Sequence, residues 1–229
     1  MKIYNFSEYS SLYNKFLSEL RDAQIQKDSM RFRKNLERLG QISAYEISKS
    51  LDNYTLSTNT PLGISTTKVP LENIVLATIL REGLPLHNGL LNYFDSAENC
   101  FISAFRKHTS SNDFDVEIEY LASPKLDGKV VLLSDTMLAS GQSMVLAYKA
   151  LLEKGNPSEI HLVSVIGSQQ GIDFVTQNFP ENTTLWIGGI DPKMTTQSYI
   201  VPGLGDAWDL AFGEKDDELI GLQYYMFFF

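Results

Sequence analysis

The sequence is poor in cysteine, because Cys100 is the only one among 229 residues. A single thiol can form neither an intrachain disulfide nor a cysteine-based zinc site, which favours a reducing compartment. Cys100 opens an apolar segment, as is typical of a small buried side chain and not of a nucleophile. The sequence also lacks an N-terminal signal pattern and any apolar run near the roughly 20 residues of a membrane span. We therefore expect a cytoplasmic protein with no membrane partner.

Positive charge is scarce as well. The chain has 19 Lys and Arg against 28 Asp and Glu, and a formal net charge of -9. Such a surface repels nucleic acid and anionic membranes, so we expect no nucleic-acid partner. An anionic substrate would need local help from Mg²⁺ or from a few well-placed basic side chains. The length allows one large α/β domain, and we expect a single domain over residues 1–229.

Apolar segments alternate with helical patterns along the chain. The predicted strands are residues 74–80, 101–105, 130–133, 160–167 and 184–191. Their order predicts an α/β fold with a mainly parallel sheet flanked by helices. An apolar stripe predicts N-terminal helices within 9–51, broken near Gln24 to Asp28. The composition predicts an edge hairpin or small antiparallel addition at 53–73 and a flexible arm with short β pairing, a small hood, at 107–120.

The chemistry is expected to start at Asp135, which falls where the strand of residues 130–133 is predicted to end. Small and hydroxyl residues, Ala139 to Ser143, follow, and then an apolar helical pattern. The first N–H groups of a helix are unpaired and lie at the positive end of its dipole, so this order can cradle a phosphate. Gly141 lets the backbone approach closely, and Asp135 can bind sugar hydroxyls or approach a metal. The spacing alone fits an ordinary strand, turn and helix equally well.

Residues 135–143 read Asp-Thr-Met-Leu-Ala-Ser-Gly-Gln-Ser. This sequence resembles the ribose-phosphate signature of the type I phosphoribosyltransferases, in the form used by uracil phosphoribosyltransferases. The resemblance implies the fold of that family and binding of 5-phosphoribosyl 1-diphosphate (PRPP), with the acid at the ribose hydroxyls and the turn around the 5-phosphate. The implied PRPP-binding residues here are Asp135, Thr136, Met137, Leu138, Ala139, Ser140, Gly141, Gln142 and Ser143. The family usually has Pro in place of Thr136 and Gly in place of Gln142.

Two further blocks match the diphosphate contacts of the family. Arg81 follows the strand of residues 74–80, and the fork of donors on an arginine suits a diphosphate. A structural ion pair with Glu82 or another acid is the alternative. The family usually has Ala in place of Glu82. Phe105-Arg106 matches a Tyr-Arg pair that precedes the arm. The resemblance therefore implies that Arg81 and Arg106 bind PRPP and that Arg106 is catalytic.

The last block is Tyr-Ile-Val-Pro-Gly-Leu-Gly-Asp-Ala-Trp-Asp at residues 199–209, which resembles the uracil-binding turn of the family. A rigid turn with exposed backbone groups can recognise the edge of a flat base. The resemblance implies uracil contacts from Ile200, Gly205, Asp206 and Ala207, with Asp206 also near PRPP and catalytic together with Asp135 and Arg106. Helix capping is the alternative role of Asp206. Trp208 replaces the usual Gly, and Leu210 stands where a basic residue is common.

The four blocks together resemble a uracil phosphoribosyltransferase of pyrimidine salvage, which converts uracil and PRPP to UMP and diphosphate. The resemblance implies Mg²⁺ held mainly through PRPP, with no protein metal ligands, GTP as an activator, and a homodimer or larger oligomer. The departures at Glu82, Thr136, Gln142 and Trp208 leave open a catalytically weak regulatory protein that binds nucleotide or PRPP, and the same fold acting on another base. The aromatic extension at 216–229 is expected to pack against its own domain or a second subunit.

Overall fold

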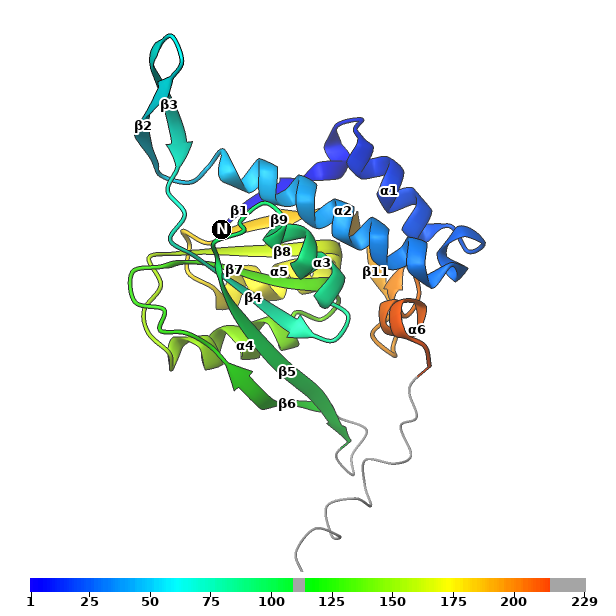
Figure 1. Cartoon of the computed structure of the whole chain (residues 1–229). Coiled ribbons are helices and arrows are strands. Elements are labelled where there is room, and N and C mark those ends of the chain that lie inside the picture. Colours follow the sequence, from blue (N-terminus) through cyan, green and yellow to red (C-terminus); the bar gives the residue numbers. More distant parts are fainter. Residues whose placement is uncertain (109–113, 215–229) are drawn as a thin grey trace, which may run out of the picture.

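The computed structural model describes residues 1–108 and 114–214, and its centre is an eight-stranded sheet in the order β1-β9-β8-β7-β4-β5-β6, with β10 beside β8 (Figure 1). Neighbouring strands are parallel except for the pair β5 and β6. The prediction of a mainly parallel sheet is therefore confirmed. The strands are β1 (Lys2–Asn5), β4 (Ile74–Leu80), β5 (Glu98–His108), β6 (Phe114–Ala122), β7 (Val130–Leu138), β8 (Glu159–Ser168), β9 (Thr184–Ile187) and β10 (Ile190–Asp191).

Helices cover both faces of this sheet. One face carries α1 (Leu12–Arg21), α2 (Ser29–Ser48), α3 (Leu84–Leu91) and α6 (Ala207–Phe212), and the other carries α4 (Gln142–Leu152) and α5 (Gln169–Asn178). Successive residues of a strand point to opposite faces, so Leu132 packs under the first group and Leu133 under the second. This two-sided burial explains why the central strands are apolar without alternation. No described helix is both long and apolar enough to cross a bilayer.

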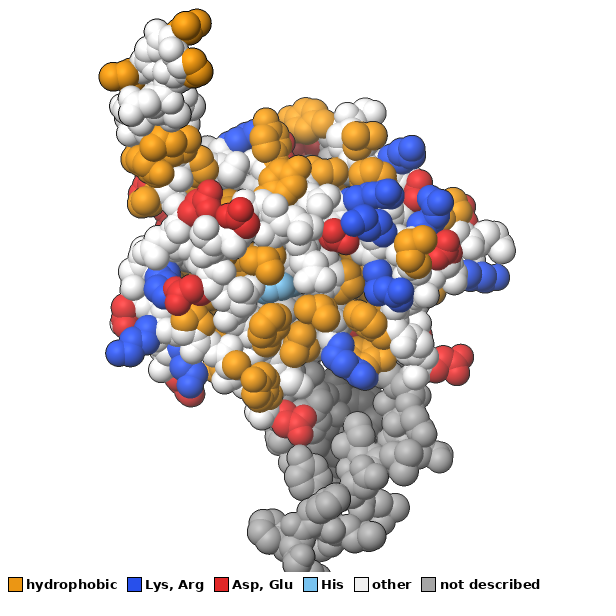
Figure 2. Space-filling model, viewed as in Figure 1, with side chains coloured by type: hydrophobic (Ala, Val, Ile, Leu, Met, Phe, Trp, Pro, Cys, Tyr) orange, Lys and Arg blue, Asp and Glu red, His pale blue; other side chains and the backbone are white. Residues whose placement is uncertain are grey.

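The N-terminal helical region has the predicted break. A short 3-10 helix, η2 (Ile25–Lys27), separates α1 from α2, and Asp28 caps α2 by accepting a hydrogen bond from the Arg31 amide. A second 3-10 helix, η1 (Phe6–Glu8), precedes α1. Lys and Arg side chains gather on the side where α2 begins (Figure 2), and several have acidic partners there, such as Arg31 with Glu19 and Lys34 with Glu37. Arg31 and Lys34 are exposed, as expected for a solvated face, whereas Arg33 is partly buried.

Two small antiparallel sheets lie outside the main one. The hairpin of β2 (Asn53–Thr60) and β3 (Gly63–Pro70) projects away from the body of the molecule (Figure 1). It forms the predicted antiparallel addition but pairs with no edge of the main sheet among the described strands. The second small sheet joins β11 (Lys193–Met194) and β12 (Ile200–Val201).

Strand β7 is longer than predicted. The expectation that it ends before Asp135 is wrong, because the strand continues to Leu138. The reason is its neighbour β8, which pairs alongside as far as Leu138 and Gly167, whereas the pairing with β4 ends at Thr78 and Ser134. Asp135 therefore lies inside a strand, at the point where β4 no longer pairs with it.

The strand order reverses between β4 and β7, and this reversal places the site. The connection from β4 through α3 leads to β5 over one face, whereas that from β7 through α4 leads to β8 over the other. A crevice opens at the carboxyl ends of the strands at such a switch point, where sheets of this class bind ligands.

The arm predicted at 107–120 falls largely within β5 and β6, which pair antiparallel, for example at Arg106 and Val116. Residues 109–113 of that arm and the C-terminal extension at 216–229 lie outside the described residues.

Candidate active site

Asp135 lies at the switch point, where it pairs with β8 and follows the last residue of β7 that pairs with β4. Its side chain is buried, with 6% of the residue surface exposed, and its backbone pairs with Ser164 of β8. On the other side, the Ser134 hydroxyl donates to Thr78 Oγ1 at 3.0 Å, which ties β7 to β4. The Thr136 hydroxyl donates to the Glu82 carbonyl at 2.7 Å. Thr136, which replaces the usual Pro, thus joins β7 to the loop after β4.

The turn before α4 has the shape of an anion cradle. Gly141 has a φ of +80°, in the left-handed region, and immediately precedes the helix. A Cβ at this position would lie 2.9 Å from the Gly171 carbonyl oxygen, so both the backbone conformation and the packing require glycine. Gln142, the first residue of α4, is exposed and needs no room inside the turn.

Ser168, which sequence reasoning missed, supports this turn from behind. The Ser168 hydroxyl donates to the Ala139 carbonyl at 2.6 Å and accepts from the Gly171 amide at 2.9 Å. Ser168 is the N-cap of α5, so one side chain both starts that helix and fixes the cradle. A serine three residues before a glycine at a helix start was the available signal.

The loop after β4 carries Arg81, which is exposed. Its guanidinium carbon lies over the Trp208 ring, 3.0 Å from the ring centroid. The diphosphate loop and the base-binding turn predicted from the sequence are therefore in direct contact, through the residue that replaces the usual glycine of the turn.

In the predicted base-binding turn, the side chains named by the prediction are buried or engaged in capping. Ile200 and Ala207 are buried and pack into the apolar cluster beneath α1, α2 and α3, so their side chains point inward. Asp206 caps α6, because its carboxylate accepts from the Trp208 amide at 2.9 Å and from the Asp209 amide at 3.2 Å. The capping role of Asp206 is thus confirmed, while contacts of Ile200, Gly205, Asp206 and Ala207 with a base remain predictions.

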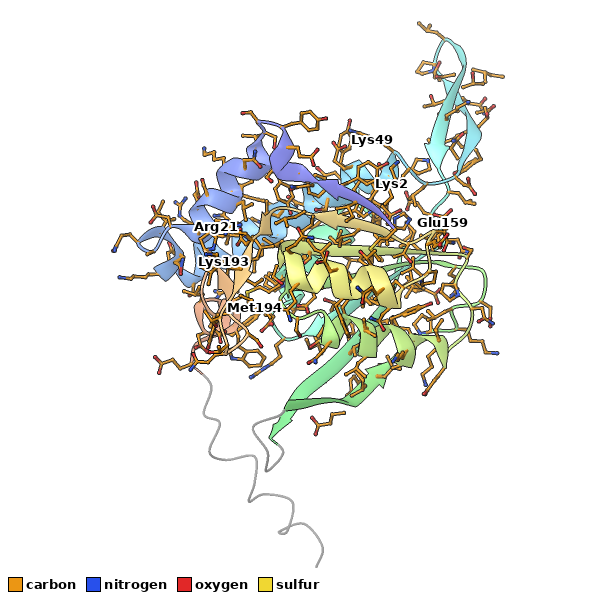
Figure 3. The ribbon with its side chains drawn as sticks, turned by 180° about the vertical axis from the view of Figure 1, so that it is seen from behind. Lys2, Arg21, Lys49, Glu159, Lys193 and Met194 are labelled. Atoms are coloured by element: carbon orange, nitrogen blue, oxygen red, sulfur yellow. The ribbon has the colours of Figure 1, made fainter. Side chains whose placement is uncertain are left out.

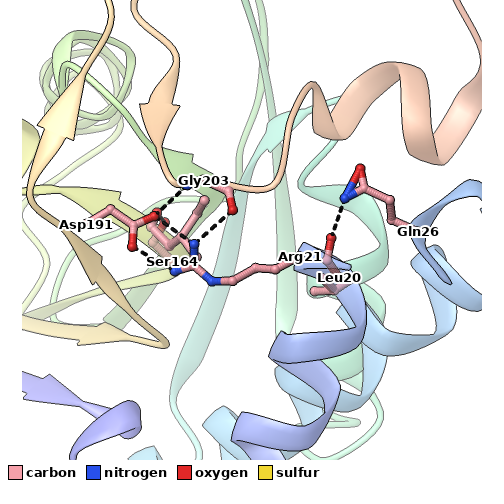
Figure 4. Close-up of polar contacts among 7 residues, drawn as sticks. Leu20, Arg21, Gln26, Ser164, Asp191 and Gly203 are labelled. Atoms are coloured by element: carbon pink, nitrogen blue, oxygen red, sulfur yellow. Dashed lines mark hydrogen bonds and ion pairs between the residues drawn. The ribbon is translucent and has the colours of Figure 1, made fainter. Parts of the chain in front are cut away.

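A buried ion pair fixes the same turn from the N-terminal side (Figure 4). Arg21 at the end of α1 donates to both carboxylate oxygens of Asp191, at 2.8 and 2.9 Å, and to the Gly203 carbonyl at 2.8 Å. The Gly203 amide in turn donates to Asp191 at 3.0 Å. Viewed from behind, Arg21 lies beside the β11 segment, which carries Lys193 and Met194 (Figure 3). Sequence reasoning missed both Arg21 and Asp191.

Strand β5 carries the backbone of Arg106, but its side chain lies outside the described part of the chain, so its contact with diphosphate stays a prediction. Cys100 on the same strand is fully buried, and burial raises the pKa of its thiol. A buried neutral thiol is a poor nucleophile, in agreement with its predicted structural role.

The described residues contain no group of three or more His, Cys, Asp or Glu side chains that could hold a metal ion. Magnesium keeps several waters in many sites and binds through one or two carboxylates together with substrate phosphates. A buried Asp135 beside an anion cradle fits an ion that arrives mainly on a phosphorylated substrate.

A buried acid and a left-handed glycine turn before a helix, both at the carboxyl ends of parallel strands, are typical of α/β enzymes that bind phosphorylated ligands. The family model described as uracil phosphoribosyltransferase matches residues 9–214. The chain therefore belongs to the uracil phosphoribosyltransferase family.

Individual relatives agree with this assignment. A uracil phosphoribosyltransferase of Porphyromonas gingivalis is 54% identical over 94% of this chain and 100% of its own length. One from Sulfurisphaera tokodaii is 38% identical over 86% of this chain and 94% of its own. A solved structure from Aquifex aeolicus superposes with a TM-score of 0.81 at 26% identity, over 93% of this chain and 99% of that one.

Proposed function

We propose that this enzyme transfers the 5-phosphoribosyl group of PRPP to N1 of uracil, which gives UMP and diphosphate. The observation that carries the proposal is the joining of three segments at one edge of the sheet. Thr136 links the cradle strand to the diphosphate loop, and Arg81 links that loop to the base-binding turn. Family membership and the identity to relatives that bear this name support the same reaction. They do not favour the alternative of a catalytically weak regulatory protein.

In the proposed reaction, a bond forms between uracil N1 and the anomeric carbon while the bond from that carbon to the diphosphate oxygen breaks. The proton on N1 leaves to the diphosphate or to water. Asp135 accepts hydrogen bonds from the ribose hydroxyls, and the first amides of α4 with Ser140 and Ser143 bind the 5-phosphate. Arg81 and Arg106 bind the diphosphate. Positioning and charge stabilisation are sufficient for such a transfer, so no side-chain nucleophile is required.

The backbone of residues 200–207 is proposed to bind the uracil edge through paired donors and acceptors, with Asp206 near both substrates. A site built on such pairs discriminates strongly against bases with another pattern, since mismatched groups are left unpaired. Mg²⁺ supplies neutralisation of the negative charge on PRPP and on the departing diphosphate. Asp135 is the buried carboxylate that would hold the ion, which would arrive mainly on PRPP.

The active protein is proposed to be a homodimer or larger oligomer. Support comes from the β2–β3 hairpin, which exposes the apolar side chains of Tyr54, Leu56, Leu62 and Ile64 away from the body (Figure 2). Exposed apolar surface of this kind is typical of contacts between subunits. Sedimentation of the wild type and of a Leu62→Asp, Ile64→Asp variant tests this, and a smaller species is expected for the variant.

A cytoplasmic location is proposed because the chain has a single cysteine. GTP is proposed as an activator because the chain resembles this family. Initial rates with and without GTP test the activation, and equal rates would reject it.

The deciding experiment is diphosphate release from purified protein with Mg²⁺ and PRPP, comparing uracil with cytosine, hypoxanthine and no base. Release with uracil alone is expected. Binding of PRPP or UMP by calorimetry without turnover on any base would overturn the proposal and restore the regulatory alternative. Addition of a chelator should abolish release, and excess Mg²⁺ should restore it.

A further inference from the structure

The contact between Arg81 and Trp208 joins residues from two separate parts of the fold. Arg81 directly follows β4, whose arrowhead points toward the side of the molecule on which α6 lies (Figure 1), and Trp208 is the second residue of α6. The guanidinium carbon lies 3.0 Å from the centroid of the indole ring. The guanidinium thus lies over the ring, well within the roughly 6 Å that a cation–π contact requires.

The indole is presented by a helix that is fixed at both ends. At its start, the Asp206 carboxylate accepts from the Trp208 amide, and Ala207 is fully buried. At its end, Ala211 is fully buried and its carbonyl accepts from the Arg33 guanidinium. Trp208 itself is half-buried and has only two side-chain torsions. The ring is therefore a rigid platform and Arg81 is the flexible partner.

Stacking leaves the guanidinium able to bind an anion. Its five N–H donors lie in the plane of the group, whereas the ring contacts the face. A carboxylate partner would occupy those donors and neutralise the charge, but a neutral ring does neither. An arginine held in this way keeps its charge and donors and loses less conformational freedom when a phosphorylated ligand binds.

We propose that Trp208 is a positioning residue, which holds the Arg81 guanidinium for the diphosphate of PRPP and thereby couples the diphosphate loop to the base-binding turn. This inference rests on the proposed function and deepens it. In this chain the Trp208 ring restricts the conformations of the Arg81 side chain, which a glycine at residue 208 could not do.

Calorimetric binding of PRPP to the intact protein tests the inference without turnover. Trp208→Leu should raise the dissociation constant for PRPP about fivefold to tenfold, and tenfold corresponds to about 1.4 kcal/mol. Trp208→Phe keeps an aromatic face and should stay within about twofold of the wild type. In an Arg81→Ala background, Trp208→Leu should have no further effect, because its role acts through the arginine. In steady-state assays with uracil, the KM for PRPP should rise more than kcat falls.

The matched control is Tyr45→Leu, which removes the ring beneath Lys49, another surface cation–π pair with 4.3 Å to the centroid. Figure 3 shows Lys49 well away from Arg21 and the β11 segment. Tyr45→Leu should leave PRPP binding unchanged. The inference would be overturned if Trp208→Leu bound PRPP as tightly as the wild type. It would also be overturned if Trp208→Leu weakened PRPP binding equally in the Arg81→Ala background. Either result leaves the proposed function intact. A wild-type protein that does not bind PRPP would overturn both.

Discussion

Arg21 and Asp191 form a two-pronged ion pair across the base of the predicted uracil turn, with nitrogen to oxygen distances of 2.8 and 2.9 Å. The side chains are 23% and 7% exposed, so the pair lies largely out of water. Both partners also bond to Gly203, one to its carbonyl and the other to its amide. The end of α1 therefore fixes the backbone of a turn whose proposed task is to present backbone groups to a base.

Arg21→Ala should destabilise the fold and weaken uracil binding. Removing one partner of a buried pair leaves an uncompensated charge and typically lowers the free energy of unfolding by about 3–5 kcal/mol; we expect the lower end, because Arg21 is partly exposed. The KM for uracil should rise at least tenfold, since the turn loses its anchor. Arg21→Lys keeps the charge without the fork of donors. Its free energy of unfolding and its KM for uracil should lie between those of the wild type and of Arg21→Ala.

The control for Arg21→Ala is Lys49→Ala, which breaks an ion pair with Glu46. The Lys49 side chain is 52% exposed and the Glu46 side chain is 36% exposed. Exposed pairs contribute less than about 1 kcal/mol, so both urea unfolding and uracil kinetics should remain near the wild type. If Arg21→Ala and Lys49→Ala behaved alike in both measurements, the clamp would have no special role.

Asp135→Asn should lower turnover at least tenfold, about 1.4 kcal/mol of transition-state stabilisation, because an amide offers the ribose hydroxyls fewer acceptors. The same loss is expected for Arg106→Ala. Cys100→Ala, at a buried position of β5, should leave turnover nearly intact although it removes core volume. Diphosphate release with uracil measures all three. Wild-type rates in both Asp135→Asn and Arg106→Ala would reject the site assignment.

Local patterns in the sequence predicted the sheet and the motif-bearing segments. The apolar runs at 74–80 and 130–133 predict strands buried on both faces, and β4 and β7 are those strands. The end of β7 escaped prediction because strand length depends on the neighbour that continues beside it, here β8 as far as Gly167. Periodicity within one segment contains no information about that pairing.

Contacts between distant segments were beyond the reach of the sequence. Arg21 and Asp191 are 170 positions apart, and neither stands in a recognisable motif. Trp208 was noticed only as a departure from the usual glycine, and its contact with Arg81 depends on how α6 packs against α2 and into the apolar cluster of that face. The motifs thus predicted candidate residues for the site, and only tertiary packing shows how those residues are held.

Gly141→Ala should damage the phosphate cradle. A left-handed conformation costs a residue with a Cβ about 1–2 kcal/mol, and here the new atom would also meet the Gly171 carbonyl at 2.9 Å. The free energy of unfolding should fall by about 2–4 kcal/mol. The KM for PRPP should rise at least tenfold, because the first amides of α4 move. Gly128→Ala is the matched control, since its φ is +70° but nothing lies within 4 Å of the added Cβ. That variant should lose about 1 kcal/mol of stability with unchanged PRPP kinetics.

The stability of the protein should fall in mild acid, in part because of His161. The Trp186 indole donates to Nδ1 of His161 at 3.1 Å, so the neutral ring carries its proton on Nε2, which faces Glu159 at 3.2 Å. Burial lowers the pKa of His161, and the contact with Glu159 opposes that shift in part. The unfolded chain therefore binds a proton that the folded protein resists. The contribution to stability is complete above the unfolded pKa of about 6.5 and is lost as the pH falls below it toward the lower folded pKa.

His161→Gln isolates this contribution, because glutamine keeps a hydrogen-bonding side chain but does not titrate. The test is the free energy of urea unfolding at several pH values between 8 and 5, followed by tryptophan fluorescence. The wild type should lose more stability over this range than the variant, so the gap between the two narrows as the pH falls. Burial also lowers the pKa of His87, which is present in both proteins. His87 therefore accounts for the dependence of stability on pH that remains in the variant. A gap that stays constant from pH 8 to pH 5 would show that His161 does not titrate with unfolding.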